Sequence, residues 1–170
     1  NQLTFQHFSM EHRIIETHVN VFHFTELEPE IQVLVNKAKE QYQKSYAPYS
    51  RFNVGAAVLL ENGALFEGNN QENAAYPSGI CAERVALFYA NAQFPDVPVR
   101  AIAIAAYTNG SILERPITPC GACRQVMIES QTRFNHPFDV YMIGRDEILH
   151  VADAENLLPL IFSEQALRNS

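Results

Sequence analysis

The sequence predicts an α/β fold, because runs of strand length alternate with helical segments along one chain of 170 residues. The strand-like runs are continuously apolar, whereas apolar residues in the other segments recur at helical spacing. Asn62-Gly63 marks a hairpin between two runs, since a type I′ turn needs positive φ at both of its central positions. Only Gly144-Arg145-Asp146 separates the last two runs, 138–143 and 147–151. A parallel pair needs a crossover of a dozen residues or more, so these strands are antiparallel or unpaired.

The chain is expected to consist of an N-terminal extension over residues 1–28 and a single domain over residues 29–170. Alternating apolar and polar residues predict a strand over 15–21 within the extension. Apolar residues at helical spacing predict a helix over 29–45, with Pro29 in its first turn, where proline is acceptable.

Three strands are expected in the middle of the chain. Residues 54–60 are apolar on both faces, which is typical of an interior strand. Residues 64–68 form the returning strand of the hairpin, and the continuous apolar run over 100–107 predicts another buried strand.

Two further helices begin close to the cysteines. Ser78 is expected to cap a helix over 79–92, and Thr118 is expected to cap a helix over 119–130. Free N–H groups and the positive end of the helix dipole stabilise thiolates in such opening turns. These turns contain all the cysteines of the chain: Cys81, Cys120 and Cys123.

The three cysteines predict a catalytic zinc site. A zinc ion with one open coordination position takes three protein ligands and keeps the fourth place for water. Cys120 and Cys123 form a Cys-x-x-Cys, whose sulfurs can converge on one metal, and Cys81 supplies a third thiolate. Water activated by a metal needs a proton shuttle beside it, and Glu83 is placed for that role. One zinc ion per chain is therefore expected.

Three other interpretations of the cysteines are open. A structural zinc site needs four closed ligands, but the chain has no fourth cysteine. A Cys-x-x-Cys alone is also found in redox pairs. Three buried thiols without any function are common in chains of this length. The carboxylate of Glu83, with Pro119 and Arg84 at their positions, favours the catalytic site over these three.

Arg84 is expected to support the metal site electrostatically. Three thiolates on Zn²⁺ leave a formal charge of −1, which weakens the acidification of a bound water. Two helix dipoles and the guanidinium of Arg84 can offset that charge. We therefore expect Arg84 to donate a hydrogen bond to a cysteine sulfur.

Composition excludes several classes of function. The net charge is −7 and no basic run is present, which argues against a nucleic-acid partner. No stretch of 18 apolar residues occurs, so no membrane span is expected. An odd number of cysteines fits a reducing compartment, and a cytoplasmic protein is expected.

Four motifs, in order and with matching spacing, resemble those of the nucleoside-type cytidine deaminases. The resemblance is continuous over about 46–130 and extends more loosely to Phe162. The motifs are Tyr49-Ser50-Arg51-Phe52-Asn53-Val54-Gly55-Ala56-Ala57, Gly68-Asn69-Asn70-Gln71-Glu72-Asn73-Ala74-Ala75-Tyr76, Cys81-Ala82-Glu83-Arg84 and Pro119-Cys120-Gly121-Ala122-Cys123-Arg124-Gln125.

The resemblance implies a fold, an assembly and a set of site residues. The fold is a three-layer α-β-α sandwich around a five-stranded mixed sheet, with the last two strands antiparallel. The assembly is a homotetramer with shared active sites. The implied roles are zinc binding by Cys81, Cys120 and Cys123, proton transfer by Glu83, ribose binding by Asn70 and Glu72, pyrimidine packing by Phe52, a base contact by the Ala82 backbone, and a contact to a neighbouring subunit's site by Phe162.

The activity that the resemblance implies is hydrolytic deamination of cytidine and 2′-deoxycytidine to uridine and 2′-deoxyuridine, with release of ammonia, in pyrimidine salvage. A second possibility is deamination of a related cytosine nucleoside such as an aminoacyl-nucleoside antibiotic. A third is a catalytically silent module that binds zinc and nucleoside, although the presence of Glu83 argues against it. Polynucleotide editing is disfavoured, because the acidic charge opposes a nucleic-acid substrate.

Overall fold

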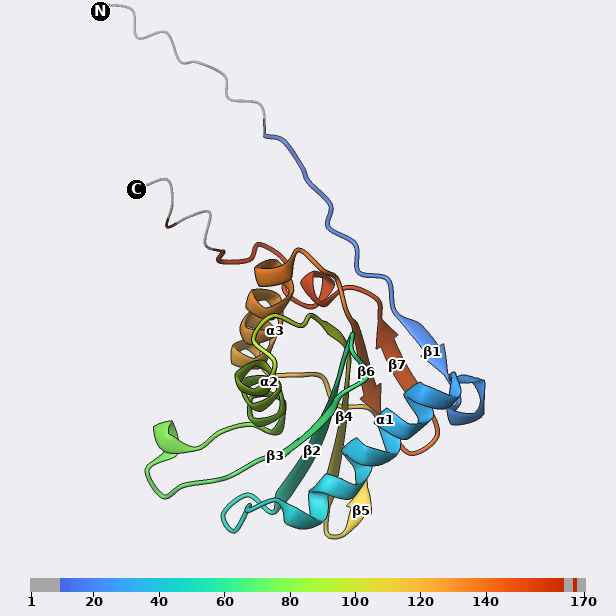
Figure 1. Cartoon of the computed structure of the whole chain (residues 1–170), viewed down its shortest axis with the longest axis vertical. Coiled ribbons are helices and arrows are strands. Elements are labelled where there is room, and N and C mark those ends of the chain that lie inside the picture. The colour runs from blue at the N-terminus through green and yellow to red at the C-terminus, as the bar shows by residue number, and fades with distance from the viewer. Residues whose placement is uncertain (1–9, 164–166, 168–170) are drawn as a thin grey trace, which may run out of the picture.

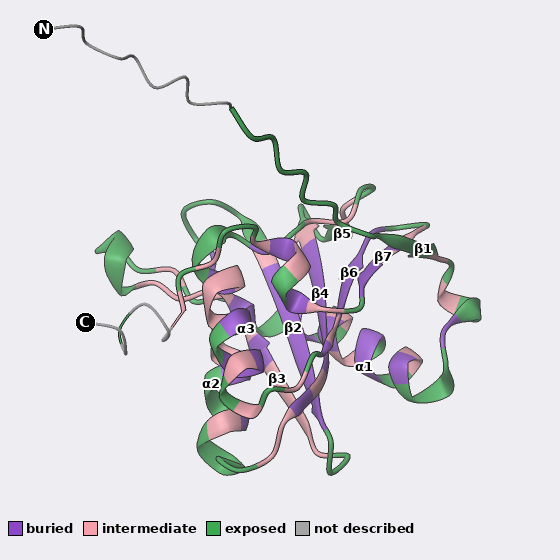
Figure 2. Ribbon diagram, turned by 90° about the horizontal axis from the view of Figure 1, so that it is seen from above, coloured by how far each residue is buried: buried purple, intermediate pink, exposed green. Residues whose placement is uncertain are grey.

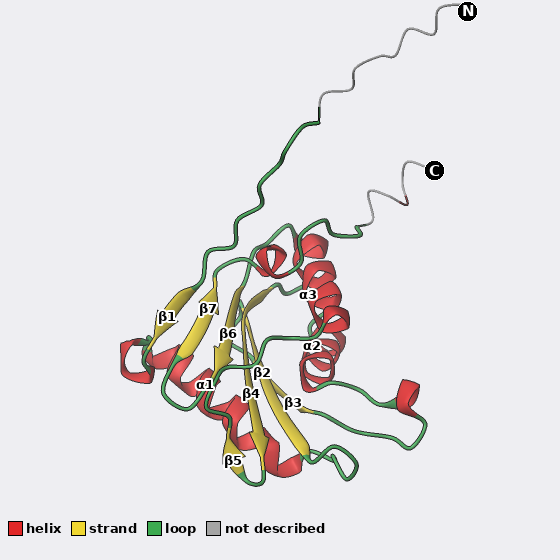
Figure 3. Cartoon of the chain, turned by 180° about the vertical axis from the view of Figure 1, so that it is seen from behind, coloured by secondary structure: helices red, strands yellow, loops and turns green. Residues whose placement is uncertain are grey.

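Helices cover both faces of one mixed β-sheet in this computed structural model, which describes residues 10–163 and Leu167 (Figure 1). Within the described residues the sheet has seven strands in the order β1-β7-β6-β4-β2-β3, with β5 also paired to β4. Helix α1 lies on one face, and α2 and α3 lie on the other (Figure 3). The strands are β1 (Asn20–Phe22), β2 (Phe52–Leu60), β3 (Leu65–Asn69), β4 (Val99–Thr108), β5 (Ser111–Ile112), β6 (Asp139–Ile143) and β7 (Ile148–Val151). The helices are α1 (Pro29–Glu40), α2 (Ala82–Gln93) and α3 (Gly121–Phe134), with 3₁₀ turns at Phe24–Glu26, Gln41–Lys44, Tyr76–Ser78 and Ala154–Leu157.

The predicted α/β fold is confirmed, and five of the strands are the expected ones: β3, β2, β4, β6 and β7. The strands β6 and β7 are antiparallel, as their short connection allows, whereas β4 and β6 are parallel and joined through α3. The short strands β1 and β5 extend this sheet by antiparallel pairing with β7 and β4.

The central strands are buried on both faces, so two hydrophobic layers share them (Figure 2). On the α1 side, the fully buried residues of β4 are all alanines, and their small side chains allow α1 to approach the sheet closely. On the side of α2 and α3, β4 contributes two isoleucines as well as smaller residues. The alanines are Ala101, Ala103 and Ala105, and the residues facing α2 and α3 are Ile102, Ile104 and Ala106.

The strand predicted over 15–21 is largely wrong. Only Asn20–Phe22 is a strand, which pairs with β7, and the residues from 10 to 19 have no regular structure. The alternating apolar side chains of Ile15 and Val19 are exposed. A segment of alternating apolar and polar residues forms a strand only where the edge of a neighbouring strand can pair with it. Strand β7 has four residues and is too short to pair with the whole segment.

The helix predicted over 29–45 begins at Pro29 as expected but ends earlier as an α-helix, at Glu40, and continues as a 3₁₀ turn to Lys44. The sequence also favours a short helix after Phe162, but that segment lies almost wholly outside the described residues. No helix among the described residues is both long enough and apolar enough to cross a membrane.

The hairpin at Asn62-Gly63 forms with a different turn from the predicted one. Gly63 has a φ of 81°, but Asn62 is not among the described residues with positive φ. The Gly63 N–H donates to the Leu60 carbonyl at 2.9 Å, and the Leu60 N–H donates to the Ala64 carbonyl at 2.9 Å. These bonds define a three-residue loop with glycine in the left-handed position, which needs positive φ at one residue only.

A close contact between β3 and α2 leads to a stability prediction. A Cβ atom added at Gly68 would lie 2.5 Å from the Ala86 nitrogen and 2.6 Å from the Ala82 oxygen. Both are backbone atoms, so Gly68→Ala must displace the whole helix. We expect this variant to lower the free energy of unfolding by about 2–3 kcal/mol, measured by urea denaturation.

Gly121→Ala is the matched control, because nothing lies within 4 Å of its added Cβ. We expect its free energy of unfolding to stay within about 1 kcal/mol of the parent value. Equal stability of the Gly68→Ala variant and the parent would contradict the close contact.

Candidate active site

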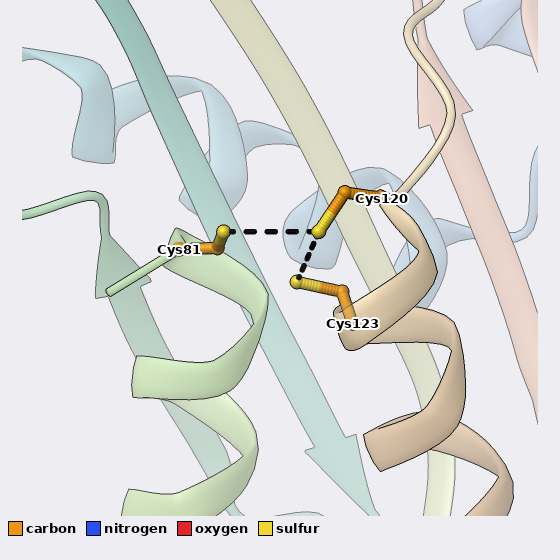
Figure 4. Close-up of side chains that lie close together, drawn as sticks. All are labelled: Cys81, Cys120 and Cys123. Atoms are coloured by element: carbon orange, nitrogen blue, oxygen red, sulfur yellow. Dashed lines mark hydrogen bonds between the residues drawn. The ribbon is translucent and has the colours of Figure 1, made fainter. Parts of the chain in front are cut away.

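The sulfur atoms of the three cysteines converge between the starts of two helices (Figure 4). Cys81 precedes α2, whereas Cys120 and Cys123 belong to the start of α3. The Cys81 and Cys120 sulfurs are 3.9 Å apart, and the Cys120 and Cys123 sulfurs are 3.5 Å apart. Tetrahedral zinc with Zn–S bonds of about 2.3 Å needs sulfurs about 3.8 Å apart. The cluster therefore fits one zinc ion held by three thiolates.

Both helices begin at a cysteine and not at the predicted caps. Cys81 and Cys120 are the N-cap residues and have extended backbones, with ψ of 152° and 164°. Ser78 ends a 3₁₀ turn and does not cap α2. The backbone N–H and carbonyl of Ile80 pair with those of Gln71 at 2.9 and 3.0 Å, which prevents a helix from including residue 80.

The predicted cap at Thr118 is also wrong, because its side-chain oxygen accepts a hydrogen bond from Arg124 at 3.0 Å. Arg124 donates two further bonds, to the carbonyls of Pro119 and Leu157. The guanidinium thereby fixes the segment that leads into Cys120. The long side chain of Arg124 therefore holds the start of α3 in place, a role that the sequence predicted for the short side chain of Thr118.

Arg84 contacts the sulfur cluster from the first turn of α2. Its Nη2 donates to the Cys81 sulfur at 3.6 Å, as expected. This sulfur has a pKa lowered to about 5, because it accepts hydrogen bonds from the Cys123 thiol and from Arg84. The pKa of Cys123 is raised in turn, because its thiol is hydrogen-bonded to Cys81 and is buried. The cluster thus stabilises negative charge on one of its sulfurs, that of Cys81, which suits a divalent cation.

Glu83 lies beside the cluster and is 4% exposed. Burial raises the pKa of its carboxyl group, because the charged form loses its hydration. A buried carboxyl group with a raised pKa holds a proton more readily than an exposed one, which suits general acid–base chemistry.

A cavity of about 750 Å³ opens beside these groups. It gathers all but two of the sequence-predicted site residues: Phe52, Asn70, Glu72, Cys81, Ala82, Glu83, Arg84 and Cys120. Of the remaining two, Cys123 does not line the cavity but is buried, with its sulfur 3.5 Å from that of Cys120. Phe162 does not line the cavity and is 61% exposed, with its carbonyl accepting a hydrogen bond from Gln125 at 2.9 Å.

The side chains of Asn70 and Glu72 are bound to the chain segment that enters β2. The Asn70 amide accepts from the Val54 N–H at 2.8 Å and donates to the Phe52 carbonyl at 2.9 Å. The Glu72 carboxylate accepts from Ser50 and Tyr49, and these hydrogen bonds lower its pKa, that from the Ser50 hydroxyl most. Both residues therefore shape the cavity wall.

Sequence reasoning assigned no role to Tyr49, Ser50 and Tyr76, although all three line the cavity. The rings of Tyr49 and Tyr76 meet edge to face, with centroids 6.5 Å apart. All three residues belong to the deaminase-like motifs, and this was the sequence feature that could have indicated a place in the site. Their contacts depend on how the two loops fold against each other, which spacing alone does not reveal.

The fold and the sulfur cluster define a zinc-binding enzyme of the α/β class. Residues 29–135 match the family model of the cytidine and deoxycytidylate deaminase zinc-binding region. Because this match covers more than half of the chain, the chain belongs to that family of hydrolytic deaminases, and its cofactor is zinc.

Individual relatives agree with this assignment. A cytidine deaminase of Sporosarcina psychrophila is 37% identical over 138 residues, which cover 81% of this chain and 95% of the relative. A cytidine deaminase of Halalkalibacterium halodurans is 48% identical over 98 residues, or 58% of this chain and 70% of the relative. The crystal structure of a cytidine deaminase from Burkholderia pseudomallei superimposes with a TM-score of 0.64 and 42% identity, covering 76% of this chain and 97% of that one.

The contact between Arg84 and Cys81 predicts an effect on metal retention. Arg84→Gln removes the positive charge beside the sulfur, so we expect zinc transfer to a colorimetric chelator to be about tenfold faster. Arg133→Gln is the matched control, because Arg133 lies on the surface near the end of α3 and donates to the Pro95 carbonyl. Equal rates of zinc loss in the Arg84 variant and the parent would show that the contact does not support the metal.

Proposed function

We propose that the protein catalyses the hydrolytic deamination of cytidine and 2′-deoxycytidine to uridine and 2′-deoxyuridine, with release of ammonia, as a step of pyrimidine salvage. The observation that carries the proposal is the single cavity in which the sulfur cluster, the buried Glu83 and the polar pair Asn70 and Glu72 meet. The names of the relatives, which are cytidine deaminases, support the same substrate.

Cys81, Cys120 and Cys123 would hold the zinc ion, which supplies a Lewis acid that makes water a stronger nucleophile at neutral pH. Arg84 would reduce the negative charge on these sulfurs through its hydrogen bond to Cys81. Among the described residues, the group of side chains close enough together to hold a metal ion consists of these three cysteines.

Glu83 would move the protons of the reaction. Its carboxylate accepts a proton from the attacking water and delivers it to N3 of the pyrimidine, while the water oxygen bonds to C4. It then takes the proton of the hydroxyl now on C4 and delivers it to the amino group. The C4–N bond breaks, ammonia departs and the C4 carbonyl of the uracil ring forms. Burial suits this shuttle, because the raised pKa brings the carboxyl closer to the pH at which it must both accept and donate.

Other residues of the cavity would orient the nucleoside. Phe52 would pack on the pyrimidine, and the backbone of Ala82, at the start of α2, would contact the base. Asn70 and Glu72 would bind the ribose, chiefly its 3′-hydroxyl. Since that hydroxyl is present in both sugars, we propose that cytidine and 2′-deoxycytidine are both substrates.

We further propose that the chain acts as a homotetramer in the cytoplasm, with residues 29–170 as one catalytic domain and 1–28 as an extension. The exposed aromatic side chains of Phe88, Tyr89 and Phe162 support an assembly, because burying them against other subunits is favourable. The free thiols of the three cysteines suit a reducing compartment.

Replacing the proton shuttle should abolish turnover but not zinc binding. We expect Glu83→Gln to lower kcat for cytidine by about 10²- to 10⁴-fold, measured by the ultraviolet change on deamination. Zinc determined on the same sample should remain at the parent level, because Glu83 is not a ligand. The control is Glu129→Gln, an exposed position of α3.

Two results would contradict this part of the proposal. Full activity in Glu83→Gln would assign proton transfer to another group. A parent protein that binds zinc and cytidine without turnover would indicate the silent binding module instead.

The shared active site predicts complementation between two defective chains. Phe162→Ala should raise KM, because a neighbouring subunit loses a contact, and the control Val33→Ala changes an exposed residue of α1. When Glu83→Gln and Phe162→Ala chains are mixed and reassembled, activity should exceed the sum of the two, since some sites combine an intact Glu83 with a neighbour's Phe162. A monomer in light scattering would refute the assembly.

A further inference from the structure

The turn that leads into β2 has an unusual backbone at Arg51. This residue has a φ of 56°, a left-handed conformation that costs free energy for any residue other than glycine. Its N–H donates to the Ala47 carbonyl at 3.0 Å, which closes the turn. The flanking residues Ser50 and Phe52 both line the cavity. A strained turn between two cavity residues must be held by interactions around it.

Ser50 supplies those interactions on one side of the turn. Its hydroxyl donates to Oε1 of Glu72 and accepts from the Phe52 N–H at 3.0 Å. Oε2 of Glu72 also accepts from the N–H groups of Tyr49 and Ser50, at 2.9 and 3.2 Å. One hydroxyl therefore bridges the carboxylate of Glu72 and the backbone of Phe52 across the strained residue.

Glu72 is left with little freedom by these bonds. An ionised carboxylate offers about four acceptor positions, and the turn occupies three of them. About one position remains for a ligand, and a carboxylate without a proton can only accept. The group is thus prepared for a single hydroxyl donor, in an orientation that Ser50 sets.

Phe52 is held from both sides. Ser50 accepts from its N–H, and the Asn70 amide donates to its carbonyl at 2.9 Å. The position of the ring and that of the Glu72 carboxylate consequently depend on the same serine.

We propose that Ser50 is a positioning residue that couples sugar recognition by Glu72 to the placement of Phe52. This inference rests on the proposed function, in which Glu72 binds the ribose 3′-hydroxyl. Ser50 itself contacts no reacting atom. It keeps the turn in its left-handed conformation, so that the carboxylate and the ring meet the two halves of one nucleoside at a fixed separation.

The test compares Ser50→Ala with the parent on two substrates, cytidine and 3′-deoxycytidine, which lacks the hydroxyl assigned to Glu72. With cytidine, we expect KM to rise about tenfold, since a hydrogen bond to a charged group is lost, while kcat changes little. With 3′-deoxycytidine, the parent already lacks the sugar contact, so the same substitution should raise KM only about twofold. Ser50→Thr keeps the hydroxyl and should restore most of the affinity for cytidine.

Ser45→Ala is the matched control. The Ser45 hydroxyl also makes two hydrogen bonds near the start of β2, since it donates to the Tyr42 carbonyl and accepts from Asn53. It does not line the cavity or contact Glu72. Ser45→Ala and Ser50→Ala should lower the melting temperature similarly, but only Ser50→Ala should change discrimination between the two substrates.

Two outcomes would overturn the coupling: an equal rise of KM on both substrates, or an unchanged KM for cytidine. Either result leaves deamination by the parent intact. If the parent deaminates neither substrate, the proposed function has failed instead, so the two failures are distinguishable.

Discussion

The structure depends on one constraint: the N-termini of α2 and α3 must hold three cysteine sulfurs close together. Thiolates placed so close together repel each other, and their charge must be compensated where they stand. The free N–H groups at the starts of α2 and α3, the guanidinium of Arg84 and the zinc ion provide that compensation together. Each helix begins at a cysteine, so any shift of α2 or α3 along its axis would also change the separation of the sulfurs.

The sheet keeps these helix starts in place and brings residues that line the cavity to them. Strands β2 and β3 are antiparallel, so the beginning of β2 and the end of β3 lie side by side, with Gly55 opposite Asn69. Phe52 and Asn70 therefore reach the cavity from neighbouring strand ends. On the same side, Gly68 lets the backbone of α2 pack directly on β3. The cavity thus lies between the ends of β2 and β3 in the sheet and the N-terminus of α2 in the helix layer.

The sequence was sufficient for the features that local chemistry determines. The central strands were predicted from their apolar runs, and the sulfur cluster was predicted from the spacing of Cys81, Cys120 and Cys123, because each feature depends on few neighbours. The helix starts were placed too early, because the pairing of Gln71 with Ile80 and the hydrogen bonds of Arg124 are contacts that spacing does not encode. The hydrogen bond on which the proposed role of Ser50 rests joins it to a loop more than twenty residues away. Most of the segment 15–21 is not a strand, because the edge of β7 is too short to pair with all of it.

The short strand β1 has a consequence for how this protein behaves among copies of itself. Without it, β7 would present four residues of unpaired backbone, mostly apolar, at the border of the sheet. Such borders are templates on which other chains can add strands and aggregate. With β1 in place, the edge strand is only three residues long, and the residues that precede it, 10–19, have no regular structure. Strand β1, whose residues do not line the cavity, thereby shields the backbone of β7 from pairing with strands of other chains.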